Sequence, residues 1–491
     1  MKDPVAGENV IIVGAGIGGL STGILLLLLG YRVTVVEKNP RPGGLMRSYL
    51  RGGVDCPVGV HYVGALGPSE PLGKMFRALG ISVEDLFCAM GSSGVVDRYL
   101  FDDFVFDMPP GMDAYERNLR QACPAEFPAL DILMNSLREI SRQMMDPSFF
   151  LRQSDPFQNM DLLRPMGEFL DDLRASARLR ALLAVPCQLI GVDLDDCPVI
   201  FHHMTVAGYL FSSWRLKEGG GRMADAFAQR FTSLGGKLIL NSAVRRINVS
   251  SHKVTGITRA DGEELFADAV VAAIHPKTML SMLDPGALRI SLRERILTLE
   301  ETKGVISVQA GIDAAAHREL DYNIYRLRHD ERGGITNGIF YQIRKGNVSG
   351  TNLLSIIARS FYGDWSRWEN TVSGKRGADY EEKKLTIARD LLKKSEEVFG
   401  PLKNAEILDV FTPLTLRDYV NCPEGSCYGV SRSVRQMLKI ASLNKLSVDG
   451  LFLAGQNAVA PGVMGSILGS FNAVRQLIGP ECFYRGLPRL L

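Results

Sequence analysis

The sequence has little that points to nucleic acid or to a metal ion. Its 491 residues carry a net charge of only +2, and no run of Lys and Arg or stripe of basic and aromatic residues would form a nucleic-acid-binding face. The eight cysteines are scattered, without a CxxC pair or a cluster with histidine at the spacing of metal ligands. We therefore expect no metal site and no nucleic-acid partner, and the cysteine usage fits a reduced, cytoplasmic chain.

Long apolar runs are scarce as well. Residues 9–29 are almost entirely apolar, but Gly14, Gly16, Gly18 and Gly19 interrupt the run, and no charged leader or small-residue cleavage site accompanies it. No other stretch reaches the roughly 20 apolar residues that a membrane-spanning helix needs. We expect a cytoplasmic protein without a transmembrane anchor. The chain exceeds one ordinary domain of roughly 100–200 residues, which predicts two domains around a shared cleft.

What the N-terminal run does contain is a complete βαβ unit. NVIIV (9–13) predicts a buried strand, Gly14, Gly16 and Gly19 then occupy the GxGxxG positions, and the second strand ends at Glu37. Gly14 permits the tight turn, Gly16 lets the backbone approach a pyrophosphate, and Gly19 lets the helix lie close to the strand. The helix N-terminus attracts phosphates, while the Glu37 carboxylate would bind ribose hydroxyls and repel a 2′-phosphate. The unit predicts a dinucleotide site that disfavours NADP.

The residues after Glu37 separate FAD from NAD. Arg41, Pro42, Gly43 and Gly44 form a turn that resembles the arginine and double-glycine element of flavoproteins in the amine oxidase and phytoene desaturase superfamily. The resemblance implies a second close backbone approach and a cation at bound FAD. Only one complete dinucleotide fingerprint is present, so a firmly bound NAD(P)H is not expected.

A second nucleotide element stands at the end of the chain. GLFLAGQNAVAPGVMGSILGSFNAVRQLI (450–478) reads as a strand, a glycine turn, a loop and a helix. In glutathione-reductase-like flavoproteins such a strand and helix return to the nucleotide domain. The helix N-terminus then faces the flavin pyrimidine, where negative charge develops on reduction. Gly462, Val463 and Met464 are the candidate N–H donors.

We predict an α/β fold, with a Rossmann-like, glutathione-reductase-like FAD-binding domain that is discontinuous and a mixed α+β substrate domain. The FAD-binding domain would comprise residues 1–90, 215–285 and 436–491, and the substrate domain residues 91–214 and 286–435. Shorter patterns predict helices over 113–200, a β-meander over 237–276, further strands within 303–360 and a helix over 379–399.

Four segments carry a family resemblance that covers almost the whole chain. They are GVHYVG (59–64), HHMTVAGYLFSSWRLKEGG (202–220), TPLTLRDYVNCPEGSCYG (412–429) and the C-terminal GLFLAGQN with PGVMGSILGS (450–470). On these segments the chain is similar to the carotenoid and retinoid oxidoreductases, which include phytoene desaturases, carotenoid isomerases and retinol saturases, and it looks closest to the retinol-saturase-like proteins.

The resemblance implies an FAD-dependent enzyme that desaturates, saturates or isomerises a polyene or other isoprenoid, with an electron acceptor or donor that the sequence does not identify. Departures from the retinol saturase pattern fall on the substrate side, which puts retinol itself in doubt. They are Pro57, Ala207, Gly208 and the stretch Leu216, Lys217 and Glu218.

The flavin supplies the hydride chemistry, so the protein must bind it, hold an apolar chain against it and exclude water. His61 is the candidate polar group near the flavin, because its segment directly follows the FAD turn, and Tyr62 and Tyr428 are candidates for the same cleft. Packing is the preferred interpretation for His202, His203 and Trp214. We expect further cofactor contacts at Lys38, Val244, Gly455, Gln456 and Asn457.

Several alternatives stay open. The segment 144–170 is rich in Met and Phe, which suits a lipid-lined tunnel, a surface in peripheral contact with a membrane, or ordinary core. A flavin amine oxidase acting on a small amine is the second functional hypothesis. It would need an aromatic cage at the flavin, and no clear aromatic pair stands out in the sequence. A non-enzymatic FAD-binding or carrier protein is the third.

Overall fold

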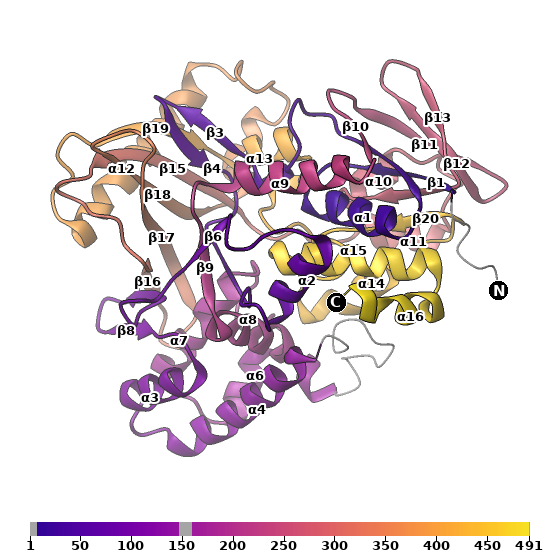
Figure 1. Ribbon diagram of the computed structural model, residues 1–491. Helices are drawn as coiled ribbons and strands as arrows, with labels where there is room; N and C mark the ends of the chain where they lie inside the picture. Colours follow the sequence, from indigo (N-terminus) through magenta and orange to yellow (C-terminus); the bar gives the residue numbers. More distant parts are fainter. Residues whose placement is uncertain (1–6, 147–159, 491) are drawn as a thin grey trace.

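The computed structural model describes residues 7–146 and 160–490, and its centre on the nucleotide side is a parallel five-stranded sheet (Figure 1). The strand order is β10-β2-β1-β14-β20, and every neighbouring pair is parallel. Three distant stretches of chain build this sheet: β1 (Asn9–Val13), β2 (Arg32–Val36), β10 (Lys237–Ile239), β14 (Ala269–Ala272) and β20 (Leu451–Leu453). The predicted α/β architecture, with a parallel sheet built from separate stretches of the chain, is confirmed.

Both faces of this sheet are buried, because alternate residues of each strand point to opposite sides. Val10 and Ile12 of β1 pack against α1 (Ile17–Leu28), α2 (Pro71–Leu79), α9 (Gly220–Ser233) and α15 (Gly462–Ile478). Ile11 and Val13 pack on the other side. The elements there are the meander of β11 (Val244–Ser250), β12 (Lys253–Arg259) and β13 (Glu264–Phe266) with α10 (Pro276–Ser281), α11 (Ile290–Leu297) and α14 (Met437–Ser442).

The meander is smaller than the sequence pattern predicts. Only β11, β12 and β13 form it, whereas the first and last strands of the stretch 237–276 join the parallel sheet. β10 pairs with β2, and β14 pairs with β1 and β20. Strands of three or four residues carry too little alternation to reveal which sheet they will join.

A seven-stranded sheet dominates the other part, in the order β19-β15-β18-β17-β16-β7-β8 (Figure 1). α12 (Ala378–Phe399) covers one face of it, which agrees with the helix expected over 379–399. The strands are β7 (Asp97–Leu100), β8 (Val105–Met108), β15 (Gly304–Asp313), β16 (Asn323–His329), β17 (Ile335–Lys345), β18 (Thr351–Ser360) and β19 (Glu406–Phe411).

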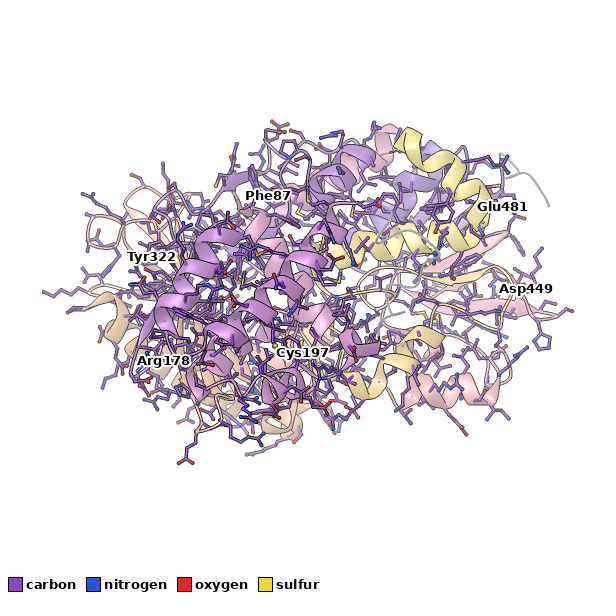
Figure 2. The ribbon with its side chains drawn as sticks, turned by 90° about the horizontal axis from the view of Figure 1, so that it is seen from below. Phe87, Arg178, Cys197, Tyr322, Asp449 and Glu481 are labelled. Carbon is purple, nitrogen blue, oxygen red and sulfur yellow. The ribbon has the colours of Figure 1, made fainter. Side chains whose placement is uncertain are left out.

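A helical layer packs at the β7–β8 end of this sheet. It forms one core from α3 (Met112–Ala122), α4 (Phe127–Met145), α6 (Met166–Asp172), α7 (Ala177–Gln188) and α8 (Val199–Phe211). In Figure 2 the labelled Arg178 and Tyr322 lie toward one end of the molecule, and Asp449 and Glu481 lie at the other, on the nucleotide side.

The two parts meet at a three-stranded sheet of β5 (Tyr62–Gly64), β9 (Ser213–Leu216) and β6 (Phe87–Ala89). The boundary expected between residues 214 and 215 falls inside β9. α11 lies beyond the expected boundary at 285, yet Leu292 and Ile296 pack in the core of the nucleotide side. We therefore propose that the nucleotide-binding domain continues to about residue 299.

Four apolar residues in the described part of the Met- and Phe-rich segment belong to the core. Met144, Met166, Phe169 and Leu170 are buried among the helices of the helical layer. The remaining aromatic residues of the segment, within 147–159, lie outside the described residues. Within the described part of the chain, no helix combines the length and apolar character needed to cross a membrane.

Candidate functional site

The glycine loop between β1 and α1 leaves room where a dinucleotide would lie. Gly14 has a φ of +100°, which favours glycine, and a Cβ at Gly19 would lie only 2.0 Å from the Gly14 carbonyl oxygen. A Cβ at Gly16, by contrast, would meet nothing within 4 Å. The space beside Gly16 and the free N–H groups at the start of α1 fit a pyrophosphate. Each glycine thus stands where its expected role requires.

Glu37 follows β2 and is buried beside the glycine loop. Its Oε2 accepts a hydrogen bond from the Ala15 N–H at 2.9 Å, and its Oε1 accepts from the backbone and side-chain nitrogens of Asn39 at 2.9 and 2.7 Å. The Ser242 N–H donates to the Glu37 backbone carbonyl at 2.8 Å, and Val244, the expected cofactor contact, begins β11 two residues later. The arrangement holds a fixed negative charge where the ribose hydroxyls of an adenosine would lie.

The double-glycine turn lies directly against the glycine loop. The Gly43 N–H donates to the Ala15 carbonyl at 2.7 Å, and Gly16 and Gly43 form a parallel bridge. Gly43 and Gly44 both have positive φ values, of 114° and 54°. The turn therefore supplies a second backbone surface at the pyrophosphate position.

The basic side chains near this turn differ in exposure and in hydrogen bonding. Arg41 is exposed. Lys38 is not free, because its Nζ donates to the Asp418 carbonyl and the Asn421 side chain at 2.8 Å each, at the end of α13 (Pro413–Val420). Arg47, which sequence reasoning missed, donates through Nε to the Gly44 carbonyl at 3.0 Å. Burial lowers the pKa values of Lys38 and Arg47.

The loop after β20 contacts the start of α1 through glycines. A Cβ at Gly18 would lie 2.5 Å from the Gly455 Cα, and a Cβ at Gly469 would lie 2.2 Å from the Gly455 oxygen. The Ser470 hydroxyl also donates to the Gly18 carbonyl at 2.7 Å. These contacts fix the C-terminal loop and α15 on α1, so the two nucleotide elements of the sequence form one site.

A buried arginine holds this loop from behind. The Arg432 guanidinium donates to the carbonyls of Val430, Gln456 and Val459 at 3.3, 2.8 and 3.1 Å. Burial lowers the pKa of Arg432 to about 10. The Asn457 Oδ1 accepts from the Val430 N–H at 3.0 Å. Gln456 and Asn457 are thus tied to the segment 430–432, and Arg432 is a residue that no sequence motif indicated.

A cavity of about 340 Å³ opens where α15 begins. Gly462, Val463 and Met464 line it at the helix N-terminus, together with the predicted His61, Tyr62 and Tyr428. The fold therefore brings the expected helix N-terminus and all three expected side chains to one space. Most of the remaining wall is apolar or aromatic, for example Leu45, Val60, Leu189, Met204, Phe340 and Ile357.

His61 enters the cavity wall as a neutral group. Burial, and then the charge of Arg344, lower the pKa of His61 to about 3. The ring packs edge-on against Phe340 at 5.3 Å between centroids, and neither ring nitrogen has a hydrogen-bond partner. A neutral imidazole offers one donor and one acceptor. An unpaired buried polar group costs about 1–3 kcal/mol, which a polar atom of a bound molecule would relieve.

The tyrosines form the aromatic pair that the sequence did not reveal. The rings of Tyr62 and Tyr209 lie 4.7 Å apart in the cavity wall, and Tyr325 and Tyr428 line the same space. Tyr62 comes from β5, Tyr209 from α8 and Tyr325 from β16, so no local pattern could have grouped them. Burial raises the pKa values of all four hydroxyls.

One end of the cavity is charged. Lys303 Nζ lies 2.6 Å from Asp193 Oδ2, and Arg359 Nη2 lies 3.2 Å from Asp193 Oδ1. All three residues line the cavity together with Gln188, which also contacts Arg359. Two cations face one carboxylate here, which leaves one positive charge in excess.

His202 and His203 are packing residues, as expected. His202 Nε2 donates to the Leu183 carbonyl at 3.0 Å, so its Nδ1 must accept the proton of His203 Nδ1, also at 3.0 Å. Burial lowers the pKa of His202 to about 4 and that of His203 further. Neither lines the cavity. Trp214 donates to the Ser212 hydroxyl at 2.7 Å and packs at the edge of the nucleotide-side core.

Comparison with known proteins identifies the family. Residues 17–478 match the family described as flavin containing amine oxidoreductase. The all-trans-retinol 13,14-reductase of Macaca fascicularis is 23% identical over 523 residues, which cover 94% of this chain and 84% of that protein. The all-trans-zeta-carotene desaturase of Myxococcus xanthus is 23% identical over 522 residues, which cover 98% of this chain and 95% of the desaturase. A solved putrescine oxidase variant shares the fold, with a TM-score of 0.67 and a sequence identity of 14%. The match covers 98% of this chain and 99% of the putrescine oxidase chain.

These findings agree with the geometry of the site. The glycine loop, the fixed Glu37 carboxylate, the double-glycine turn and the N-terminus of α15 fit FAD, and the expected cofactor is confirmed. The resemblance to the carotenoid and retinoid oxidoreductases is confirmed as well. Among the residues that the structure covers, no group of three or more His, Cys, Asp and Glu side chains could hold a metal ion. The chain is an FAD-dependent oxidoreductase and belongs to the flavin-containing amine oxidoreductase family.

Proposed function

We propose that the enzyme changes the bond order or the geometry of a double bond in a polyene or other isoprenoid, by desaturation, saturation or isomerisation. The observation that carries the proposal is the largely apolar cavity that begins at the N-terminus of α15. Relatives named for retinol reduction and carotene desaturation support it. A long apolar chain would gain about 25 cal/mol for each Å² of apolar surface that it buries there.

Different groups of the site would bind the cofactor, stabilise charge and orient the substrate. FAD, when bound, supplies hydride transfer. Glu37 and the glycine loop would hold its adenosine and pyrophosphate groups. The N–H groups of Gly462 to Met464 would stabilise negative charge at the flavin, because a helix N-terminus carries a partial positive charge. Neutral His61 would orient the substrate or the flavin by hydrogen bonding, and the apolar wall would exclude water.

Oxidation of a small amine is the second candidate function. The paired rings of Tyr62 and Tyr209 favour it, as does the fold shared with a putrescine oxidase. The excess positive charge at Lys303 and Arg359 weighs against it, because it would repel an ammonium group. The apolar wall and the charged end together suit a long chain with one polar end better than a cation.

Anaerobic incubation with substrate panels tests the proposal. The FAD-loaded protein, oxidised in one series and chemically reduced in the other, would be incubated with retinoids, carotenoids and small amines. We expect a mass change of two units, or an isomer at constant mass, in at least one polyene. Rapid reduction of the flavin by an amine, with every polyene unchanged, would contradict the proposal. Peripheral membrane contact and a cytoplasmic location stay predictions, and flotation with vesicles would test the former.

A further inference from the structure

A buried hydrogen-bond chain leads from the cavity wall to a carboxyl group. The Tyr62 hydroxyl donates to Asp97 Oδ2 at 2.9 Å, and the hydroxyls of Tyr62 and Tyr325 lie 2.8 Å apart. Tyr62 and Tyr325 line the cavity, whereas Asp97 lies behind them in β7 and is 1% exposed. The chain therefore connects a carboxyl that solvent does not reach with the space proposed for the substrate.

The far side of Asp97 is fixed by two amides. Asn323 Nδ2 donates to Asp97 Oδ1 at 2.9 Å, and Gln342 Nε2 donates to Asn323 Oδ1 at 2.8 Å. The side-chain oxygen of Asn323 accepts from Gln342, so the side-chain nitrogen of Asn323 must be the atom that faces Asp97. Oδ1 of Asp97 is thus always an acceptor, and Oδ2 is the oxygen that gains or loses a proton.

This geometry permits two directions of hydrogen bonding. With Asp97 ionised, Tyr62 donates to Asp97 and Tyr325 donates to Tyr62, so the Tyr325 oxygen presents a lone pair to the cavity. With Asp97 protonated, Asp97 donates to Tyr62 and Tyr62 donates to Tyr325, so the Tyr325 hydroxyl proton is free to point into the cavity. The state of Asp97 decides whether Tyr325 offers the cavity a proton or accepts one.

The surroundings allow both states near neutral pH. The titratable groups that face Asp97 are four tyrosines: Tyr62 of β5, Tyr99 of β7, Tyr209 of α8 and Tyr325 of β16. None of the ion pairs within residues 7–146 and 160–490 includes Asp97. Burial raises the pKa of Asp97 to about 7, although the hydrogen bonds from Asn323 and Tyr62 oppose the shift.

We propose that Asp97, Tyr62 and Tyr325 form a proton relay that opens on the cavity, in which Asp97 stores the proton and Tyr325 exchanges it with the substrate. The inference rests on the proposed function. In saturation, one carbon of the double bond gains a hydride from the reduced flavin, which supplies both electrons. The other carbon gains the Tyr325 proton. Tyr325 then takes the proton of Tyr62, Tyr62 takes that of Asp97, and Asp97 becomes a carboxylate. After product release, a proton from solvent that enters the cavity passes back through Tyr325 and Tyr62 and protonates Asp97 again.

Infrared spectroscopy tests, without any substrate, whether Asp97 holds a proton. We expect oxidised, FAD-loaded protein to show a carboxylic C=O band that disappears as the pH rises through about 7 and that is missing in Asp97→Asn. Tyr62→Phe should shift this band, because it removes the hydroxyl oxygen to which the protonated Oδ2 donates. Identical spectra of the wild type and Asp97→Asn at pH 5 would show that Asp97 holds no proton and would overturn the relay.

Turnover measurements test whether Tyr325 exchanges the proton with the substrate, and Tyr99→Phe is the matched control. Tyr99 is buried and pairs with Tyr325 across β7 and β16, but its hydroxyl donates to Met108 Sδ at 3.3 Å and it does not line the cavity. We expect Tyr325→Phe to slow polyene reduction on the order of a hundredfold with FAD still bound, and Tyr99→Phe to match the wild type. Asp97→Asn should lose the fall in rate with rising pH.

Equal rates in the two tyrosine variants, or an unchanged pH profile in Asp97→Asn, would exclude the relay. A wild type that reduces no polyene would instead contradict the proposed function. The infrared titration would still decide in that case whether Asp97 exchanges a proton. The two failures can therefore be told apart.

Discussion

Glu37 shows how one residue prepares the nucleotide site before any ligand arrives. Three N–H groups, from Ala15 and from the backbone and side chain of Asn39, point at its carboxylate. Hydrogen bonds to a charged acceptor are roughly twice as strong as neutral ones, so the carboxylate has a set position and does not need to reorganise when ribose binds. Oε2, which accepts only from Ala15 within the described residues, can still accept a further hydrogen bond.

Replacement of Glu37 by Gln should weaken FAD binding by about 1–3 kcal/mol, because the amide loses the charge and turns an NH₂ group toward an N–H donor. Titration of apo-protein with FAD, followed by flavin fluorescence, measures the change. Glu84→Gln is the control, since Glu84 is exposed and distant in sequence from the loop. Equal affinities in the two variants would show that Glu37 makes no contact with the nucleotide.

The residues that the sequence indicated belong to local motifs, whereas the residues that it did not indicate depend on contacts distant in sequence. Gly16, Glu37 and His61 lie in or next to local motifs, and the structure places them in the glycine loop, beside it and in the cavity wall. Their contacts with FAD stay predictions. Arg432 and Asp97 act mainly through contacts that are distant in sequence. Arg432 holds Gln456, 24 positions away, and Asp97 bonds to Tyr62, 35 positions away. Nothing near either residue in the sequence announces those partners, so only the folded chain reveals them.

At the scale of elements, α1 and α15 are held at a glycine contact rather than by side chains. Gly18, Gly455 and Gly469 bring backbone against backbone, and this contact sets the position of the loop 455–457 on α1. The GAGIGG motif contains Gly18, but its fingerprint positions are Gly14, Gly16 and Gly19. The partner of Gly18 lies more than 400 residues away, which is why its role was not predicted.

A methyl group at Gly18 should therefore disturb both stability and binding. We expect Gly18→Ala to lower the free energy of unfolding by about 1–3 kcal/mol, the usual cost of overpacking, and to weaken FAD binding. Gly208→Ala is the control for stability, since Gly208 is also helical but its Cβ would meet nothing within 4 Å, and alanine there should be neutral or stabilising. Urea unfolding of both variants gives the comparison. A Gly18→Ala protein as stable as Gly208→Ala would show that the backbone contact can relax.

At the scale of the whole molecule, the sequence predicted the nucleotide side well and the cavity only in part. The glycine loop, the returning C-terminal strand and helix and the discontinuous sheet follow from local patterns. The cavity needs β5, α8, β16 and the start of α15 in one place, and its tyrosines come from segments that share no motif. The approach of β7 to β16, which positions Asp97, is a parallel pairing between strands more than 200 residues apart.

That pairing buries Asp97 and makes the stability of the molecule depend on pH. The native pKa of about 7 lies above the value near 3.9 of an unfolded aspartate, so the native state binds the extra proton between these two pH values. Stability is then greatest below about pH 4 for this group and falls as the pH rises through 7. The loss should be on the order of 2–4 kcal/mol, because each pKa unit corresponds to about 1.4 kcal/mol.

Asp97→Asn cannot ionise, so its stability relative to the wild type should rise between pH 4 and 8. Asp321→Asn is the control, because hydrogen bonds from Ser92 and Ser93 outweigh burial and lower the pKa of Asp321. The stability that ionised Asp321 contributes is lost only below about pH 4, so the difference between this variant and the wild type should stay nearly constant from about pH 5 to 8. Chemical unfolding of the wild type and both variants across this range measures the two differences. Parallel curves for the wild type and Asp97→Asn would mean that the pKa of Asp97 is not raised in the native state, so that Asp97 is ionised over most of this range. The hydrogen bonds from Tyr62 and Asn323 would then hold the buried carboxylate ionised without a cation, and Asp97 could not store the proton of the proposed relay.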